Sequence, residues 1–145
     1  MTADHCAFCD GPLKVESRAT VEHFRPKSAF AQFAFTWTNL FPCCDMCQSE
    51  KRESFDERLL KPDEDGYSFG RYFVANYRTG DIEALPSAPA EEQARAIETI
   101  RMYGLNSPER RKARKREWEF YLREREEPES DVLIDDYHYR FFLEG

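Results

Sequence analysis

The chain has 145 residues, enough for one domain that buries its own hydrophobic core. Its 28 acidic and 21 basic residues give a formal net charge of −7, which argues against uniform attraction to nucleic acid but leaves room for local basic clusters. No apolar run approaches the length of a membrane helix, and the first residues do not read as a signal peptide, so we expect a cytoplasmic protein with no membrane contact.

Two C-x-x-C pairs stand in the first third of the chain, Cys6 with Cys9 and Cys44 with Cys47. In a reducing compartment such pairs bind metal more often than they form disulfides, so we predict that these four cysteines hold one structural Zn²⁺. Buried free thiols are the alternative. Cys43 competes with Cys44 as a ligand because it lies one helical turn before Cys47, but the x-x spacing favours Cys44.

The segments around these pairs predict short elements. We expect a hairpin over residues 13–24 and a packed loop over residues 28–42 that includes a helical turn. A helix is expected over residues 44–52, followed by a polar connection over residues 53–66. We expect the aromatic side chains of the loop to lie in the core rather than to stack on bases: Phe30, Phe33, Phe35, Trp37 and Phe41.

The next stretch predicts a second hairpin and a helix. Tyr67–Tyr77 and Asp81–Leu85 have strand character, and Thr79-Gly80 is a typical turn between them. Apolar residues recur at helical spacing over Glu91–Tyr103, and Gly104 ends that helix.

A second helix is expected to begin at Pro108, with Ser107 as its N-cap, and to run to about Glu126. Beyond it, residues 132–134 and 137–143 predict either a closing strand pair or a docked tail, and the sequence alone does not choose between them.

An acid and a histidine, Glu22 and His23, lie between the two cysteine pairs. A neutral imidazole can take a proton from water near neutral pH, and a divalent cation can stabilise charge on a scissile phosphate. Neighbours on a strand point to opposite faces, so a common site needs an irregular strand end, which Pro26 makes plausible. The alternatives are a structural histidine and a solvated carboxylate.

These residues form a pattern that resembles the HNH endonucleases of the four-cysteine zinc type. The resemblance rests on Glu22–Lys27 (E-H-F-R-P-K), Trp37–Leu40 (W-T-N-L) and Cys44–Lys51 (C-x-x-C-x-x-x-K). It covers roughly residues 5–112. Further segments are similar to a subgroup found in bacterial anti-phage systems, including retron- and Septu-type loci: Phe55–Pro62, Gly80–Ile82 and Thr99–Asn106.

The resemblance implies an α+β fold with a ββα-metal (His-Me finger) core. A structural zinc would staple this core, and a C-terminal hairpin and helical extension would pack on it. We therefore expect a nuclease core over residues 1–66 and an extension over residues 67–145, together forming one structural domain.

The resemblance also implies roles for four residues. His23 would be the general base that activates water, and Asn39 would tie the loop to the hairpin and orient that histidine. Glu22 would bind a catalytic Mg²⁺ or Mn²⁺. Gln48 stands where the family usually has Asn or His, so its amide would reach the metal from one methylene further out, which is unfavourable for Mg²⁺.

Several cations are candidates for contacts with nucleic acid. Arg25 and Lys27 follow the histidine, and Lys51 matches the lysine of the motif. The alternative role for these three residues is ordinary surface charge. For the helix that carries the basic run described next, the alternative is ion pairing with acidic neighbours. A basic run further on has cations on every face of its helix: Arg110, Arg111, Lys112, Arg114, Lys115 and Arg116.

The expected function is metal-dependent hydrolysis of phosphodiester bonds in DNA, with RNA not excluded, and a role in bacterial defence. For the subgroup, an ATPase partner protein is expected. The alternatives are a zinc-stabilised binding module that has lost turnover through Gln48, and an interaction subunit whose acidic tail docks a basic partner.

Overall fold

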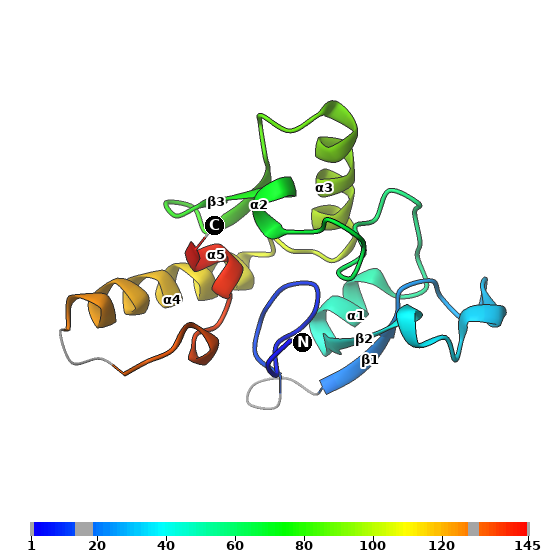
Figure 1. Ribbon diagram of the computed structural model, residues 1–145, viewed down its shortest axis with the longest axis horizontal. Helices are drawn as coiled ribbons and strands as arrows, with labels where there is room; N and C mark the ends of the chain where they lie inside the picture. Colours follow the sequence, from blue (N-terminus) through cyan, green and yellow to red (C-terminus); the bar gives the residue numbers. More distant parts are fainter. Residues whose placement is uncertain (1, 14–18, 128–130, 145) are drawn as a thin grey trace.

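The computed structural model describes residues 2–13, 19–127 and 131–144. Within these residues the chain forms a small α+β fold with two separate two-stranded antiparallel sheets (Figure 1). One sheet pairs β1 with β2, and the other pairs β3 with β4. None of the helices in this part of the chain combines the length and apolar composition needed to cross a bilayer.

The first sheet pairs β1 (Ala19–His23) with β2 (Leu40–Cys44), so that Glu22 lies opposite Phe41 and His23 opposite Leu40. The hairpin expected over residues 13–24 lies partly outside the described residues, and the observed partner of β1 is β2. The packed loop was expected to continue through residue 42, and this is wrong because β2 begins at Leu40. Pro42 is tolerated there because each strand of a two-stranded sheet has a free edge.

Helix α1 (Asp45–Lys51) follows β2 directly and packs against both strands (Figure 1). Cys44 is its N-cap, and the sulfur of that residue accepts a hydrogen bond from the backbone N–H of Cys47 at 3.4 Å. The helix expected over residues 44–52 is therefore confirmed. Between the strands, the chain forms two short 3₁₀ turns, η1 (Ala31–Phe33) and η2 (Trp37–Asn39).

The second sheet pairs β3 (Phe73–Asn76) with β4 (Asp81–Ala84), as the turn at Thr79-Gly80 predicted. The strand expected from Tyr67 is wrong in its first half, which forms the short helix α2 (Phe69–Tyr72). Helical spacing brings the rings of Phe69 and Phe73 to 5.4 Å, a contact that an extended strand would not make.

Helices α3 (Ala90–Met102) and α4 (Pro108–Glu126) agree with the predicted boundaries to within one residue. Gly104 ends the first with a φ of 57°, and the Ser107 hydroxyl caps the second by accepting a hydrogen bond from the Arg110 N–H at 3.4 Å. The predicted capping and termination signals are confirmed.

The described part of the C-terminal segment is a docked tail rather than a strand pair. It contains a 3₁₀ turn, η3 (Ile134–Asp136), and helix α5 (Arg140–Glu144). The tail contacts the N-terminal loop, since the Tyr139 N–H donates to the Asp10 carbonyl at 2.9 Å and Arg140 pairs with the Asp10 carboxylate at 2.6 Å. Buried apolar side chains form one cluster around the cysteines and another between α2, α3, α4 and the tail, and Ile100 packs against both.

Candidate functional site

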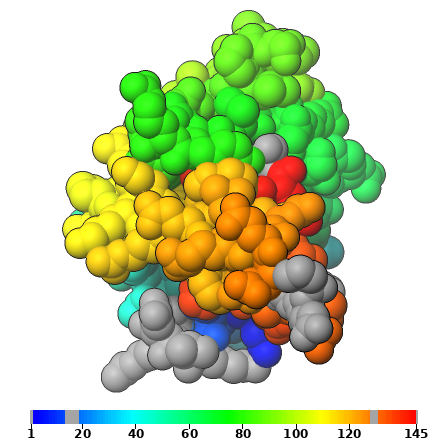
Figure 2. Space-filling model, turned by 90° about the vertical axis from the view of Figure 1, so that its left-hand side faces the viewer, coloured from blue at the N-terminus to red at the C-terminus, as the bar shows by residue number. Residues whose placement is uncertain are grey.

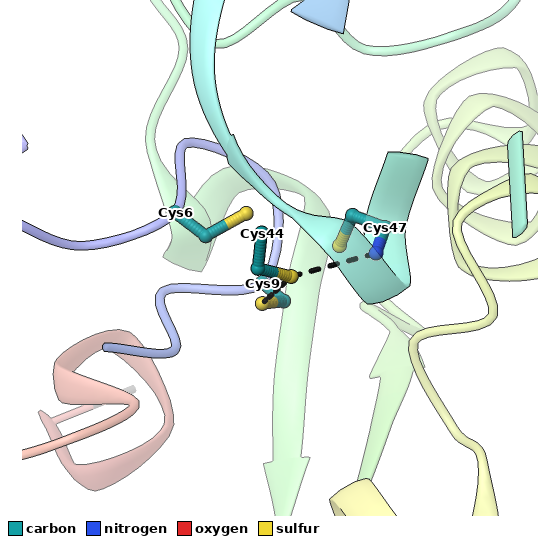
Figure 3. Close-up of side chains that lie close together, drawn as sticks. All are labelled: Cys6, Cys9, Cys44 and Cys47. Atoms are coloured by element: carbon teal, nitrogen blue, oxygen red, sulfur yellow. Dashed lines mark hydrogen bonds between the residues drawn. The ribbon is translucent and has the colours of Figure 1, made fainter. Parts of the chain in front are cut away.

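Four cysteines from distant parts of the sequence converge in the interior (Figure 3). Cys6 and Cys9 come from the N-terminal loop, Cys44 ends β2, and Cys47 lies on α1. The N-terminal loop is held in place because the Ala7 N–H donates to a β2 carbonyl at 2.9 Å. All four sulfur atoms lie within 4.8 Å of one another and all four residues are buried.

The sulfur positions fit a tetrahedral metal site. Zinc–sulfur bonds of about 2.3 Å give a tetrahedron with edges of about 3.8 Å. The Sγ atoms of Cys9 and Cys44 lie 3.8 Å apart, and both cysteines are free thiols. Hydrogen bonds from neighbouring thiols lower the pKa of Cys44 to about 7, chiefly through Cys47, whereas burial raises the pKa of Cys47. Four thiolates this close together would repel one another without a cation among them, and the sulfur spacing fits a structural zinc.

The fifth cysteine, Cys43, is fully buried but does not belong to this cluster. Its thiol donates to the carbonyl of Cys44 at 3.2 Å. The spacing argument that favoured Cys44 over Cys43 is therefore consistent with the observed set of converging sulfurs.

Arg110, on the first turns of α4, lies against the cysteine cluster and is only 3% exposed. Its guanidinium donates to the sulfur of Cys47 at 3.0 Å and to that of Cys44 at 3.7 Å. It also donates to the carbonyls of Tyr103 at 2.6 Å and Gly104 at 3.0 Å. Burial disfavours its charged form, but the nearby thiolates outweigh this and raise the pKa of Arg110 above its usual value. With zinc bound at these sulfurs, Arg110 would offset the excess negative charge of the tetrathiolate.

His23 ends β1 and turns its imidazole toward the loop that leads to β2. Its Nε2 lies 3.0 Å from the carbonyl oxygen of Ala34. A carbonyl can only accept a hydrogen bond, so Nε2 carries the hydrogen, and in the neutral ring Nδ1 holds a lone pair. The side chain is half-buried. This arrangement leaves a nitrogen base at the end of the strand.

Asn39 is buried and braces the same loop from within. Its Oδ1 accepts from the backbone N–H of Arg25 at 2.7 Å, and its Nδ2 donates to the carbonyls of Arg25 at 3.0 Å and Phe33 at 3.2 Å. Phe33 precedes Ala34, the hydrogen-bond acceptor for His23. Asn39 therefore fixes the backbone on both sides of the histidine contact.

Glu22 faces α1, away from the side on which His23 contacts the loop. Its Oε1 lies 2.6 Å from the Nζ of Lys51, and both side chains are almost completely buried. The same Nζ donates to the backbone carbonyl of His23 at 3.1 Å. Burial raises the pKa of Glu22, and the hydrogen bond from Lys51 opposes that shift. The strand continues regularly to His23, so the irregularity that would let Glu22 and His23 share one side is not observed.

The two side chains expected to hold a catalytic Mg²⁺ or Mn²⁺ do not form a ready site. Glu22 already has a cationic partner, and the Gln48 amide donates to the carbonyl of Val21 at 3.1 Å. Among the described residues, the tetracysteine cluster is the only group of three or more His, Cys, Asp or Glu side chains whose ligand atoms lie this close. In this arrangement Lys51 engages Oε1 of the Glu22 carboxylate.

The structure divides the predicted cations into three groups. Lys51, Arg110 and Arg114 are buried, so as they stand they do not form part of a surface for phosphate. Arg25 is partly covered: it pairs with Glu57 at 2.9 Å and lies over the Phe55 ring at 4.7 Å. The remaining cations are exposed: Lys27, Arg111, Lys112, Lys115 and Arg116. The last four lie on α4, which crosses the face shown in Figure 2.

Sequence reasoning misplaced two aromatic residues. Phe35 and Trp37 were expected in the core, but they are 97% and 75% exposed, whereas Phe41 is buried as expected. The spacing of apolar residues could not distinguish exposed from buried rings here, because the loop contains two short 3₁₀ turns and no regular helix or strand. The sequence reasoning also did not predict that Arg110 and Arg114 are buried. Their i,i+4 spacing was the one sequence signal that both lie on the same face of the helix.

No protein-family model matches this chain, and a comparison with curated proteins found no match either.

Proposed function

We propose that this chain is an HNH-type endonuclease that hydrolyses phosphodiester bonds in DNA, with His23 as the general base. The observation that carries the proposal is the hydrogen bond from the His23 Nε2–H to the Ala34 carbonyl, which leaves Nδ1 as an acceptor for a proton. The surrounding arrangement supports it, since two antiparallel strands and a helix are fastened by the tetracysteine cluster. We take this unit as a ββα-metal core.

In the proposed reaction, Nδ1 of His23 accepts a proton from water as the water oxygen attacks phosphorus. The bond from phosphorus to the leaving oxygen breaks, and that oxygen takes a proton from solvent water as it departs. A divalent cation, when bound, would stabilise the charge on the phosphate. Asn39 has a positioning role, since it holds the backbone that orients the imidazole.

The exposed cations of α4 give the substrate a place to bind despite the net charge of −7. Phosphate binding to such a cluster releases counterions, so affinity should fall steeply as salt is added. The same contacts would suit RNA, and a comparison of DNA and RNA substrates separates the two. Lys112, Lys115 and Arg116 are the first choices for charge-removal variants, because Arg111 also pairs with Asp81 at 2.5 Å.

The test is a plasmid-nicking assay on zinc-loaded protein with Mg²⁺ or Mn²⁺ added. His23→Ala should abolish nicking while zinc content and the circular dichroism spectrum stay at parental values. His138→Ala is the matched control, since this histidine lies in the tail and contacts Glu117. Nicking by His23→Ala at the parental rate would refute the proposed base.

A second candidate is a zinc-stabilised module that binds nucleic acid or a partner without turnover. The buried contact between Glu22 and Lys51 favours it, because that ion pair occupies the expected metal ligand. Binding without nicks under both Mg²⁺ and Mn²⁺ would support this candidate. The endonuclease proposal also includes a role in bacterial defence and an ATPase partner. Comigration with a candidate ATPase in size-exclusion chromatography tests the partnership.

A further inference from the structure

The loop between β1 and β2 exposes two large aromatic side chains, Phe35 and Trp37, which are 97% and 75% accessible. Full exposure of such a side chain forgoes about 1.5–3 kcal/mol of burial free energy. The other aromatic rings of this loop are used internally: Phe30 packs on Phe55 with ring centroids 5.2 Å apart, and Arg25 lies over the Phe30 ring at 5.2 Å. Phe35 and Trp37 therefore stand apart as the exposed pair.

The segment that carries these two rings is held at both ends. Asn39 hydrogen-bonds the carbonyl of Phe33, and the Thr36 N–H donates to the same Phe33 carbonyl at 3.1 Å. The turn η2 begins at Trp37 itself. In Figure 1 this loop projects at the edge of the molecule beyond β1 and β2. These hydrogen bonds fix the backbone from which the two rings project.

The segment that carries the rings begins next to the histidine of the proposed site. Ala34, whose carbonyl accepts from His23 at 3.0 Å, is bonded directly to Phe35. A phosphate at His23 would therefore lie beside the segment that carries Phe35 and Trp37.

The charges that belong to this stretch itself suit the phosphates of a nucleic acid. From His23 to Cys44 the chain contains no Asp or Glu, although the whole protein has 28 such residues. The same stretch contains Arg25 and the exposed Lys27. Two carboxylates approach its beginning, where Glu53 accepts from Ser28 at 2.6 Å and Glu57 pairs with Arg25.

We propose that Phe35 and Trp37 form a stacking platform for unpaired bases beside the scissile phosphate. The preferred substrate class is then single-stranded or locally unpaired nucleic acid, since bases inside an intact duplex do not offer their faces. This inference rests on the proposed function, because that function brings the phosphate to His23.

Trp37 supplies a direct readout. In zinc-loaded, full-length Trp118→Phe protein, Trp37 is the remaining tryptophan. The protein is titrated, without added Mg²⁺ or Mn²⁺, with a single-stranded oligonucleotide, with an abasic strand of equal length and with the blunt duplex. Stacking predicts that the single strand quenches Trp37 fluorescence, whereas the abasic strand and the duplex quench it far less.

The affinity arm uses Phe35→Ala and Trp37→Ala, each in the parental background. Loss of one stacked base should weaken single-strand binding roughly 5- to 150-fold and leave binding of the abasic strand unchanged. Leu133→Ala is the control, since this exposed side chain lies in the C-terminal tail. Equal losses for the single strand and the abasic strand, or no loss for either, would overturn the platform.

The outcome is separable from that of the proposed nuclease. If the parental protein does not nick but retains quenching, the hydrolytic function fails and the platform stands. If it nicks without any base-dependent quenching, the platform fails and the hydrolytic function stands.

Discussion

Arg110→Met removes a guanidinium that joins the end of α3 to the tetracysteine cluster. Methionine keeps much of the side-chain volume but donates no hydrogen bond. The change leaves the carbonyls of Tyr103 and Gly104 without this donor, and it leaves the sulfurs of Cys44 and Cys47 without their nearby cation. Arg110 is almost completely buried, so solvent would not replace these contacts.

The magnitude follows from those four contacts. An unsatisfied buried acceptor costs about 1–3 kcal/mol. Removing one member of a buried charge pair costs about 3–5 kcal/mol, because the other charge stays behind without compensation. These contributions overlap in one side chain, so we expect the free energy of unfolding of Arg110→Met to fall by about 3–5 kcal/mol in total.

Two measurements check this expectation. Urea unfolding of the zinc-loaded protein gives the free energy of unfolding, and transfer of zinc to a chromogenic chelator gives the rate of metal loss, which should rise in the variant. Arg111→Met is the matched control, because the neighbouring side chain is about half exposed and pairs with Asp81. Parental stability and parental zinc retention in Arg110→Met would refute the role assigned to this residue.

Three further predictions concern other parts of the fold. Removal of zinc by a strong chelator should unfold the N-terminal half, because a structural site of this kind contributes on the order of 10 kcal/mol; loss of the circular dichroism signal on chelation, and its return with zinc, checks this. Lys51→Met should destabilise the protein by about 3–5 kcal/mol, because it leaves the Glu22 carboxylate buried without its partner. A second change, Glu22→Gln, should restore much of the lost stability. Urea unfolding compares the two variants, and equal stability of the single and double variants would contradict this prediction. Gly80→Ala should lower the melting temperature, since its Cβ would lie 2.3 Å from the Arg111 carbonyl oxygen at a φ of 82°, whereas Gly70→Ala meets no atom within 4 Å and should leave the melting temperature equal or higher.

Local signals predicted the ends of the longer helices and one hairpin turn well. The N-cap at Ser107, the stop at Gly104 and the turn at Thr79-Gly80 each act through a few adjacent residues, and each is present as expected. The pairing of the C-x-x-C motifs was also accessible, because metal-ligand spacing constrains distant segments to meet.

Features that depend on long-range contacts could not be predicted from such local signals. Tertiary packing decides which strand pairs with β1. The sequence did not predict the strand at Leu40–Cys44, because it contains Pro42 and follows a run of aromatic residues. The exposure of Phe35 and Trp37 has the same origin, since hydrophobicity alone places both in the core. The contact between Lys51 and Glu22 joins a helix to a strand, and no sequence spacing predicts it.

The basic run of α4 contains both buried and solvent-exposed cations, which the sequence alone does not distinguish. A helix with cations at successive positions cannot bury them without partners, because a desolvated charge is costly. Arg110 and Arg114 are buried because anionic sulfurs and main-chain carbonyls receive them: Arg114 donates to the carbonyls of Gly80 at 3.0 Å and Leu105 at 2.6 Å. The cations on the other side of the helix stay in solvent. Substitutions at the inward positions should therefore alter stability and zinc retention, and those at the outward positions should alter the salt dependence of nucleic-acid binding.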